Sequence, residues 1–329
     1  MRILLIGQDN FFAGLTEVRA DFLPTRRKSL IPNASVNRIG WTGYAKIIIN
    51  LTAGRYTHCF VPAIYYDWNK TDRLKIAIRR ILKNRIVIQT VRLLLRKTRI
   101  HILDYMDYTE RALELAGDYR ASRYFKVNLR RDQHAAGDGL AFHYLPFWIN
   151  NPAAGMQPLR AFEERDVDVF FASTILSDYR KAAPGILSAL RERGFTVVCP
   201  EERLSFQDFV SILLRTKVVL APQGLGWHNY RYYESMACGS VPATNRSEED
   251  VLTDMVGGVN CLIYDSSENA VEQISSYLRG ESKLAFGTND FARFAEHRHS
   301  IEAVGQYLLA MLADDAKCAL EEAKAMTPA

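Results

Sequence analysis

The segment from Gln223 to Glu234 gathers residue types that can bind a charged ligand. Gly224 and Gly226 follow directly after an apolar run, where the chain must turn sharply and backbone amides can approach a ligand closely. A helix predicted to begin near Asn229 would point its first N–H groups and its positive dipole end at the same place. This pattern predicts a binding site for a pyrophosphate group.

Two charged residues lie inside the predicted helix. Arg231, in its first turn, can add a planar fork of hydrogen-bond donors to the anion site. Glu234 lies on the same face one turn deeper, where a carboxylate can accept two hydrogen bonds from the neighbouring hydroxyls of a ribose. The spacing therefore predicts that one side of one helix holds both the phosphates and the ribose of a nucleotide.

Each of these predictions has a structural alternative. Arg231 and Glu234 could form an exposed ion pair, with the glycines only shaping a connection. His228 could contact the phosphate or sugar from its loop, or it could pack beside Trp227 in the core.

The elements that must position this segment alternate between apolar runs and stretches of helical period, as in parallel α/β sheets. In the first half, strands are predicted at residues 2–6, 57–63, 99–103 and 124–127, with helices at 43–51, 71–82 and 109–115. In the second half, strands are predicted at 167–171, 196–199, 218–221, 241–244 and 261–264, with helices at 179–193, 206–215, 230–237, 270–278 and 290–313.

The chain has 329 residues, which exceeds the size at which a single hydrophobic core usually keeps growing. The stretch at 150–158 is rich in Asn, Pro, Ala and Gly, as an interdomain linker would be. We therefore predict an acceptor-side domain at 1–150 and a donor-binding domain at 151–329. The predicted fold class is α/β, with two Rossmann-like, doubly wound domains facing a cleft. This cleft lies between the carboxyl ends of the two sheets, where ligands bind in such folds.

The run PQGLGWHNYRYYESMACGSVPA, which begins at Pro222, resembles the C-terminal signature of exostosin-like glycosyltransferases of the GT-B type. The residues that match the layout of this signature are Pro222, Gly224, Gly226, Asn229, Arg231, Glu234, Gly239 and Pro242. Upstream, the run DVFFASTILSDYRKAAPGILSALRERG resembles the strand and helix that open the donor domain of the same family. The resemblance covers residues 167–245 and no comparable signature occurs in the N-terminal half.

The resemblance implies a glycosyltransferase that moves a sugar from a nucleotide-sugar donor to a glycan or lipid-linked glycan acceptor. It implies that Glu234 holds the donor ribose and that Arg231 contacts the phosphates. Many retaining GT-B enzymes have a second Glu eight positions earlier, where this chain has Gly226, and this difference favours an inverting reaction. The sequence has no DxD-like pair in a suitable loop and no His or Cys cluster at metal spacing, so we expect no metal and no cofactor beyond the nucleotide sugar.

An inverting reaction needs a general base at the rim of the N-terminal domain. Asp9, after the first predicted strand, is the first candidate, and Asp67, after the strand at 57–63, is the second. Asp104 or Asp107 comes third. For each of them, capping of a loop is the alternative role.

Net charge is +5, and it is unevenly distributed. Between Lys70 and Arg99 there are eleven Lys or Arg residues and one acidic residue, Asp72. Because apolar residues alternate with these charges, the span can lie on an anionic membrane surface, which would suit a lipid-linked acceptor. A solvated basic helix face and attraction to an acidic polysaccharide are the alternatives, and no nucleic-acid-binding module is recognisable.

The five cysteines are scattered, with no CxxC pair, which is typical of free thiols in a reducing compartment. The N-terminus has only a short apolar run, and it predicts a strand instead of a secretory signal. We therefore expect a cytoplasmic protein, with peripheral attachment to the inner face of the membrane as a further option. Two other functions suit the same fold: a nucleotide-sugar epimerase or hydrolase, and a non-catalytic module that binds a sugar nucleotide.

Overall fold

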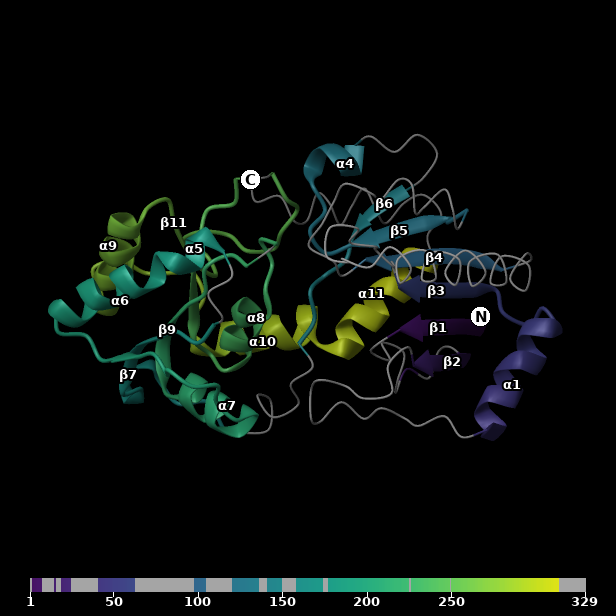
Figure 1. Ribbon diagram of the computed structural model, residues 1–329, viewed down its shortest axis with the longest axis horizontal. Coiled ribbons are helices and arrows are strands. Elements are labelled where there is room, and N and C mark those ends of the chain that lie inside the picture. The colour runs from purple at the N-terminus through teal and green to yellow at the C-terminus, as the bar shows by residue number, and fades with distance from the viewer. Residues whose placement is uncertain are drawn as a thin grey trace, which may run out of the picture. The chain divides into compact units, whose positions relative to one another are not determined.

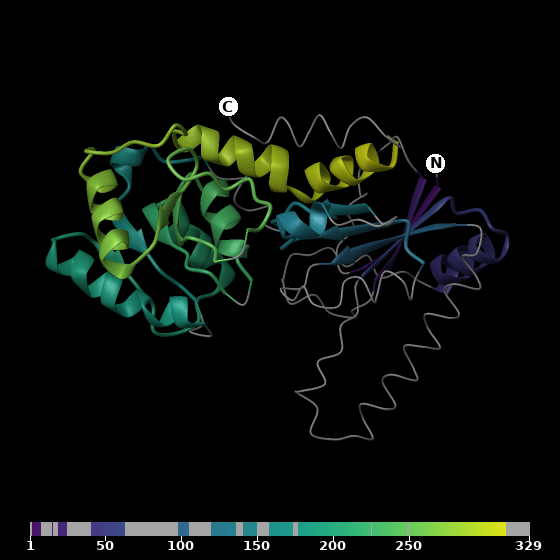
Figure 2. The same ribbon diagram turned by 90° about the horizontal axis from the view of Figure 1, so that it is seen from above.

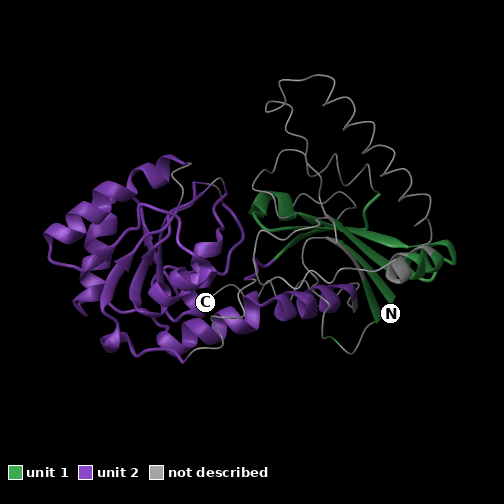
Figure 3. Cartoon of the chain, turned by 60° about the horizontal axis from the view of Figure 1, so that its bottom comes forward, with its two compact units in different colours: residues 1–145 green, residues 146–329 purple. Residues whose placement is uncertain are grey.

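The computed structural model describes residues 2–7, 15, 19–24, 41–62, 98–104, 120–135, 141–149, 158–173, 177–224, 226–248 and 250–313. The chain divides into two compact units, Met1–Leu145 and Pro146–Ala329, which are coloured separately in Figure 3. Most of the predicted linker, residues 150–157, lies outside the described residues.

The described part of unit 1 contains one parallel sheet of six strands. In chain order the strands are β1 (Arg2–Gly7), β2 (Arg19–Pro24), β3 (His58–Pro62), β4 (Arg99–Asp104), β5 (Arg123–Lys126) and β6 (Ala141–Tyr144). They lie in the order β2-β1-β3-β4-β5-β6 and fan out in Figure 2, with the twist expected of such sheets. Two helices of this unit are described, α1 (Trp41–Thr52) and α4 (Arg131–Ala135).

The described part of unit 2 contains a second parallel sheet, of five strands. These strands are β7 (Val167–Phe170), β8 (Val197–Val198), β9 (Thr216–Leu220), β10 (Val241–Asn245) and β11 (Leu262–Tyr264). A short 3₁₀ turn, η2 (Phe162–Glu164), precedes the sheet. The helices are α5 (Asp178–Lys181), α6 (Ala183–Glu192), α7 (Phe206–Leu214), α8 (Tyr230–Ala237), α9 (Ser267–Leu278), α10 (Thr288–His299) and α11 (Ile301–Ala313).

Helices cover both faces of the unit 2 sheet. Helix α6 packs beside α9, and α8 packs beside α10. Figure 1 shows the two pairs on opposite sides of β9. Because both faces are covered, central strands are buried along their whole length, as every residue of β10 is.

Hydrogen-bonding side chains fix where several of these helices begin. The Ser205 side chain accepts from the backbone N–H of Asp208 at the start of α7. Ser266 does the same for Asn269 at the start of α9. Such caps satisfy N–H groups that have no partner within the helix.

The strand order places a reversal point in each sheet. In unit 2 the order is β11-β10-β9-β7-β8, so the chain moves from β7 to one side and then returns to build β9, β10 and β11 on the other. The carboxyl ends of β7 and β9 therefore flank the position where open α/β sheets bind ligands. In unit 1 the equivalent reversal lies between β1 and β3.

Among the helices that the structure describes, none combines the length and the apolar character needed to cross a bilayer.

Candidate functional site

The loop and helix that follow β9 have the geometry of an anion site. Helix α8 begins at Tyr230, and the side chain of Asn229 caps it by accepting from the backbone N–H of Arg231 at 2.9 Å. Before the cap, the Gly224 N–H donates to the Gly226 carbonyl at 3.2 Å. The chain thus turns tightly between the sheet and the positive end of α8.

Neighbouring elements hold this loop in place at Gln223. The Ser177 hydroxyl donates to the Gln223 carbonyl at 2.7 Å, and the Gln223 N–H donates to the Asn245 side chain at 2.8 Å. Ser177 follows β7 and Asn245 ends β10, so loops at the carboxyl ends of three adjacent strands meet here. The indole N–H of Trp227 donates to the Asn245 carbonyl at 3.2 Å and fixes the later part of the loop.

Arg231 and Glu234 form an ion pair along α8. The Arg231 Nε donates to the carbonyl of Ala172, just after β7, at 2.9 Å, and its guanidinium lies 4.2 Å from the centre of the Phe209 ring. The side chains are 31% and 15% exposed. The ion pair of the structural alternative is therefore present, but it is partly buried and it spans the reversal point between β7 and β9.

Arg180, in α5, is a second cation at the glycine loop that the sequence did not single out. A Cβ atom at position 224 would lie 2.8 Å from its Nη2, so only glycine lets the guanidinium approach the loop backbone this closely. The available signal was the Arg180–Lys181 pair in the helix after the first strand of unit 2. That spacing alone does not indicate which loop the side chain reaches.

The His228 side chain lies in the interior of unit 2. Its Nδ1 is 2.7 Å from the Tyr233 hydroxyl, and its Nε2 is 3.1 Å from the Leu252 carbonyl. Burial lowers the pKa of His228 to about 4, so the ring is neutral at neutral pH. This geometry matches the packing alternative, edge-on to Trp227.

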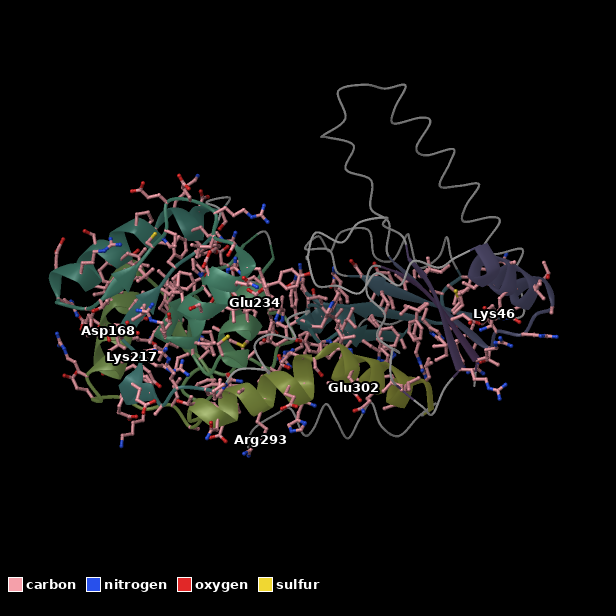
Figure 4. The ribbon with its side chains drawn as sticks, turned by 90° about the horizontal axis from the view of Figure 1, so that it is seen from below. Lys46, Asp168, Lys217, Glu234, Arg293 and Glu302 are labelled. Atoms are coloured by element: carbon pink, nitrogen blue, oxygen red, sulfur yellow. The ribbon has the colours of Figure 1, made fainter. Side chains whose placement is uncertain are left out.

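Figure 4 labels Glu234 of α8 together with Asp168 and Lys217, two charged residues on strands of the unit 2 sheet. Asp168 of β7 and Lys217 of β9 are ion-paired at 2.8 Å and lie well away from Glu234 in this view. Arg180, Arg231 and Glu234, in contrast, lie near the carboxyl ends of β7 and β9 and the amino end of α8. Two guanidinium groups and a helix amino end can bind a diphosphate, and a carboxylate beside them can accept from hydroxyl groups.

The candidate bases fall in two groups. Asp9, Asp67 and Asp107 lie outside the described residues. Asp104 ends β4 and is fully buried, where its carboxylate accepts from the Lys126 Nζ at 3.0 Å and from the Tyr124 hydroxyl at 2.7 Å. The span between Lys70 and Arg99 is also outside the described residues, apart from its last two positions.

Within the described part of the chain, no group of three or more His, Cys, Asp or Glu side chains is arranged to hold a metal ion.

Comparison with known families matches residues 180–310 to a family described as "Glycosyl transferase-like". The match covers less than half of the chain, but it begins at Arg180 and includes the whole of α8. A comparison with curated proteins gave no match.

Solved structures resemble the chain over almost its full length. The lipopolysaccharide outer core galactosyltransferase WaaB has 12% identity and a TM-score of 0.55, covering 95% of this chain and 99% of that one. An alpha-glucosyltransferase in complex with UDP-glucose and DNA containing an abasic site has 10% identity and a TM-score of 0.55, covering 95% and 100%. The N-terminal domain of Candida albicans trehalose-6-phosphate phosphatase has 10% identity and a TM-score of 0.55, covering 95% and 96%.

At these identities the likeness establishes the fold alone. The fold is the GT-B organisation of two Rossmann-like domains, each built on a parallel sheet with helices, and the predicted fold class is confirmed.

Proposed function

We propose that this chain is a glycosyltransferase that takes its sugar from a nucleotide-sugar donor, with the donor diphosphate bound at the amino end of α8. One observation carries this proposal. The loops after β7 and β9 bring Arg180, the glycine loop, Arg231 and Glu234 together at the reversal point of the unit 2 sheet. The family match over residues 180–310 and the shared fold of solved glycosyltransferases, one of them in complex with UDP-glucose, support it.

Each residue of the site has a role that its contacts suit. Arg180 and the first N–H groups of α8 bind the diphosphate and stabilise the negative charge of the leaving nucleotide. Arg231 stays anchored on the Ala172 carbonyl and Phe209, and it turns its remaining donors to the phosphates. Glu234 exchanges its bond with Arg231 for the ribose hydroxyls, which the partial exposure of the pair allows.

The transfer itself is proposed to invert the anomeric centre. A base in unit 1 takes the proton of the acceptor hydroxyl, the new glycosidic bond forms, and the bond from sugar to phosphate breaks with release of the nucleoside diphosphate. Asp9 remains the first candidate for the base and Asp67 the second. We place Asp104 behind them because its carboxylate is fully buried against Lys126 and Tyr124.

Arginine side chains and the helix dipole supply the positive charge in this scheme, so we propose a metal-independent reaction. The proposed acceptor is a glycan or lipid-linked glycan. The basic span between Lys70 and Arg99 would hold the enzyme on an anionic membrane surface on the cytoplasmic side.

Titration calorimetry with UDP, GDP, dTDP and CMP tests the donor site. Arg180→Ala and Glu234→Ala should each weaken binding of the preferred nucleotide about 10-fold, equivalent to about 1.4 kcal/mol. Arg215→Ala and Glu272→Ala are matched controls, because both residues form exposed ion pairs elsewhere in unit 2. Equal affinity in all four variants and the unchanged chain would overturn the site.

Incubation with the corresponding nucleotide sugars, with and without a glycan acceptor, tests the reaction. Transfer requires that the nucleotide, a nucleoside diphosphate or CMP, be released faster when an acceptor is present. Acceptor-independent release of free sugar, appearance of an epimerised sugar, or binding without turnover would replace the transferase with one of the three alternatives.

A further inference from the structure

A buried chain of polar side chains lies behind the glycine loop, beginning at His228. A carbonyl oxygen only accepts hydrogen bonds, so the His228 Nε2, 3.1 Å from the Leu252 carbonyl, must carry the ring proton. The unprotonated Nδ1 then accepts from the Tyr233 hydroxyl at 2.7 Å. The tautomer and the direction of this bond are fixed by the neighbours, and the pKa of His228, lowered by burial to about 4, keeps the ring neutral.

The other side of Tyr233 packs on a buried ion pair. Its ring centre lies 3.9 Å from that of His299, the last residue of α10. The His299 Nδ1 donates to the Phe147 carbonyl at 2.6 Å, and its Nε2 lies 3.1 Å from the Asp254 carboxylate. The Nε2 is within ion-pair distance of this carboxylate, although the angles of a hydrogen bond are not met. Burial alone would raise the pKa of Asp254, but the neighbouring His299 holds it below its ordinary value.

The backbone of His299 contacts the segment that begins unit 2, and His299 is also the last residue of α10. The Ile149 N–H donates to the His299 carbonyl at 2.7 Å, and Ile149 forms a parallel bridge with Ser300. Residues 146–149 are the first described residues of unit 2, and extended Ser300 separates α10 from α11. The contacts from His228 through Tyr233 to His299 therefore connect the glycine loop to the segment where the backbone enters unit 2.

We infer that Tyr233 is a positioning residue for the donor site, which holds the loop at 226–229 through His228 while the His299–Asp254 pair holds Tyr233 in place. His228 directly precedes Asn229, the cap of α8, so a shift of the imidazole displaces the cap and the amino end of the helix. A core with only a packing role would be served by Phe and an apolar residue, without the cost of burying these polar groups. The inference rests on the proposed function in that the positioned loop is the proposed diphosphate site.

Tyr233→Phe is the sharpest test, since it keeps the ring and removes only the hydroxyl. The lost hydrogen bond, worth about 1 kcal/mol, should raise amide hydrogen exchange in peptides covering 223–229 about 5-fold. The Kd for UDP should rise by a similar factor, with little change in Tm. Tyr264→Phe is the matched control, because the Tyr264 hydroxyl is buried and makes no hydrogen bond in the described part of the chain.

Asp254→Asn provides an independent second variant. It keeps the size of the side chain and removes the charge that faces His299, so exchange should rise both at 223–229 and at 147–149. Unchanged exchange at 223–229 in Tyr233→Phe, or a rise spread evenly over unit 2 with a matching fall in Tm, would overturn the inference. Faster local exchange in a chain that binds none of the four nucleotides would uphold the positioning role and remove the proposed function.

Discussion

Two ion pairs at the carboxyl ends of the two sheets differ in their access to water. In unit 1, Asp104 and Lys126 end adjacent strands, and both side chains are 0% exposed. In unit 2, Arg231 and Glu234 lie on α8 and are 31% and 15% exposed. A pair sealed from water has no ligand to exchange with, whereas a partly exposed pair can open toward one. At the carboxyl end of its sheet, unit 1 therefore has an ion pair enclosed in the core, whereas unit 2 has an ion pair that a ligand can reach.

The largest expected effect tests the sealed pair. Lys126→Met leaves the Asp104 carboxylate buried without its cation, and this should lower the free energy of unfolding by about 4 kcal/mol in urea titrations. The double variant Lys126→Met with Asp104→Leu should recover most of the loss, because two apolar side chains replace both charges.

Arg231→Ala should lower the free energy of unfolding by less than about 1 kcal/mol, as expected for a partly exposed pair. The contrast between the two pairs breaks down if Lys126→Met and Arg231→Ala prove equally destabilising.

The second prediction concerns stability at acid pH, where unit 1 should be destabilised more than unit 2. Burial, with the nearby His58 and Arg123, lowers the pKa of His101 to about 3, and burial with Arg123 lowers the pKa of His143 to about 4. Both rings are neutral when folded and take up protons near pH 6.5 when unfolded. Their stabilisation is therefore complete above pH 6.5 and declines as the pH falls toward 4.

For His101 the loss should reach about 3 kcal/mol at pH 4.5. Urea unfolding at pH 7 and pH 4.5 measures it, and His101→Phe should lose less stability between the two than the unchanged chain. Unit 1 has two histidines with a strongly lowered pKa, whereas the described part of unit 2 has one, His228. Hydrogen exchange should therefore rise first in β3, β4 and β6. An earlier rise in β9 and β10 would reverse the expected order.

The sequence predicted the central strands of unit 1 and missed two at its edges. Strands β1, β3 and β4 have neighbours on both sides and carry buried apolar residues, so they require apolar runs that are visible in the sequence. Strands β2 and β6 are the two edges of the sheet, and β2 carries Arg19 and Asp21. Edge strands need less apolar character, so their short, mixed sequences give little signal.

The sequence also predicted a single helix at 290–313, which the structure divides at Ser300. Ser300 is extended because it pairs with Ile149, far away along the chain. Local helical period contains no information about such a partner. Helix α8, in contrast, has the predicted bounds, because its cap at Asn229 and the glycine after its end are local signals.

The residues of the candidate site also differ in whether the sequence could predict them. Gly224, Gly226, Asn229, Arg231 and Glu234 are close in sequence, so spacing alone placed them on one loop and helix. Ser177 caps α5 and Arg180 lies within it, and both reach the site only because β7 lies beside β9. Strand order, which spacing along the chain does not encode, brings them there.

The roles assigned to the site residues, and the kinship with exostosin-like enzymes, remain predictions.

The third prediction concerns the far end of α8, which should affect stability without affecting the donor site. Gly239 has a φ of 70° and ends the helix, with its N–H donating to Met236 and the Ser240 N–H to Ser235. A Cβ there would lie 2.7 Å from the Nη2 of buried Arg165. Gly239→Ala should therefore lower the free energy of unfolding by about 2 kcal/mol, through backbone strain and displacement of Arg165.

Gly194 is a matched control, because it ends α6 in the same hydrogen-bonding pattern at a φ of 88° with nothing within 4 Å of its Cβ position. Gly194→Ala should show only the strain, about 1 kcal/mol, in the same urea titration. UDP affinity should stay unchanged in both variants, since Asn229 and Gln223 anchor the amino end separately. Equal losses of stability would mean that Arg165 yields without resistance, and weaker UDP binding in Gly239→Ala would mean that the two ends of α8 act together.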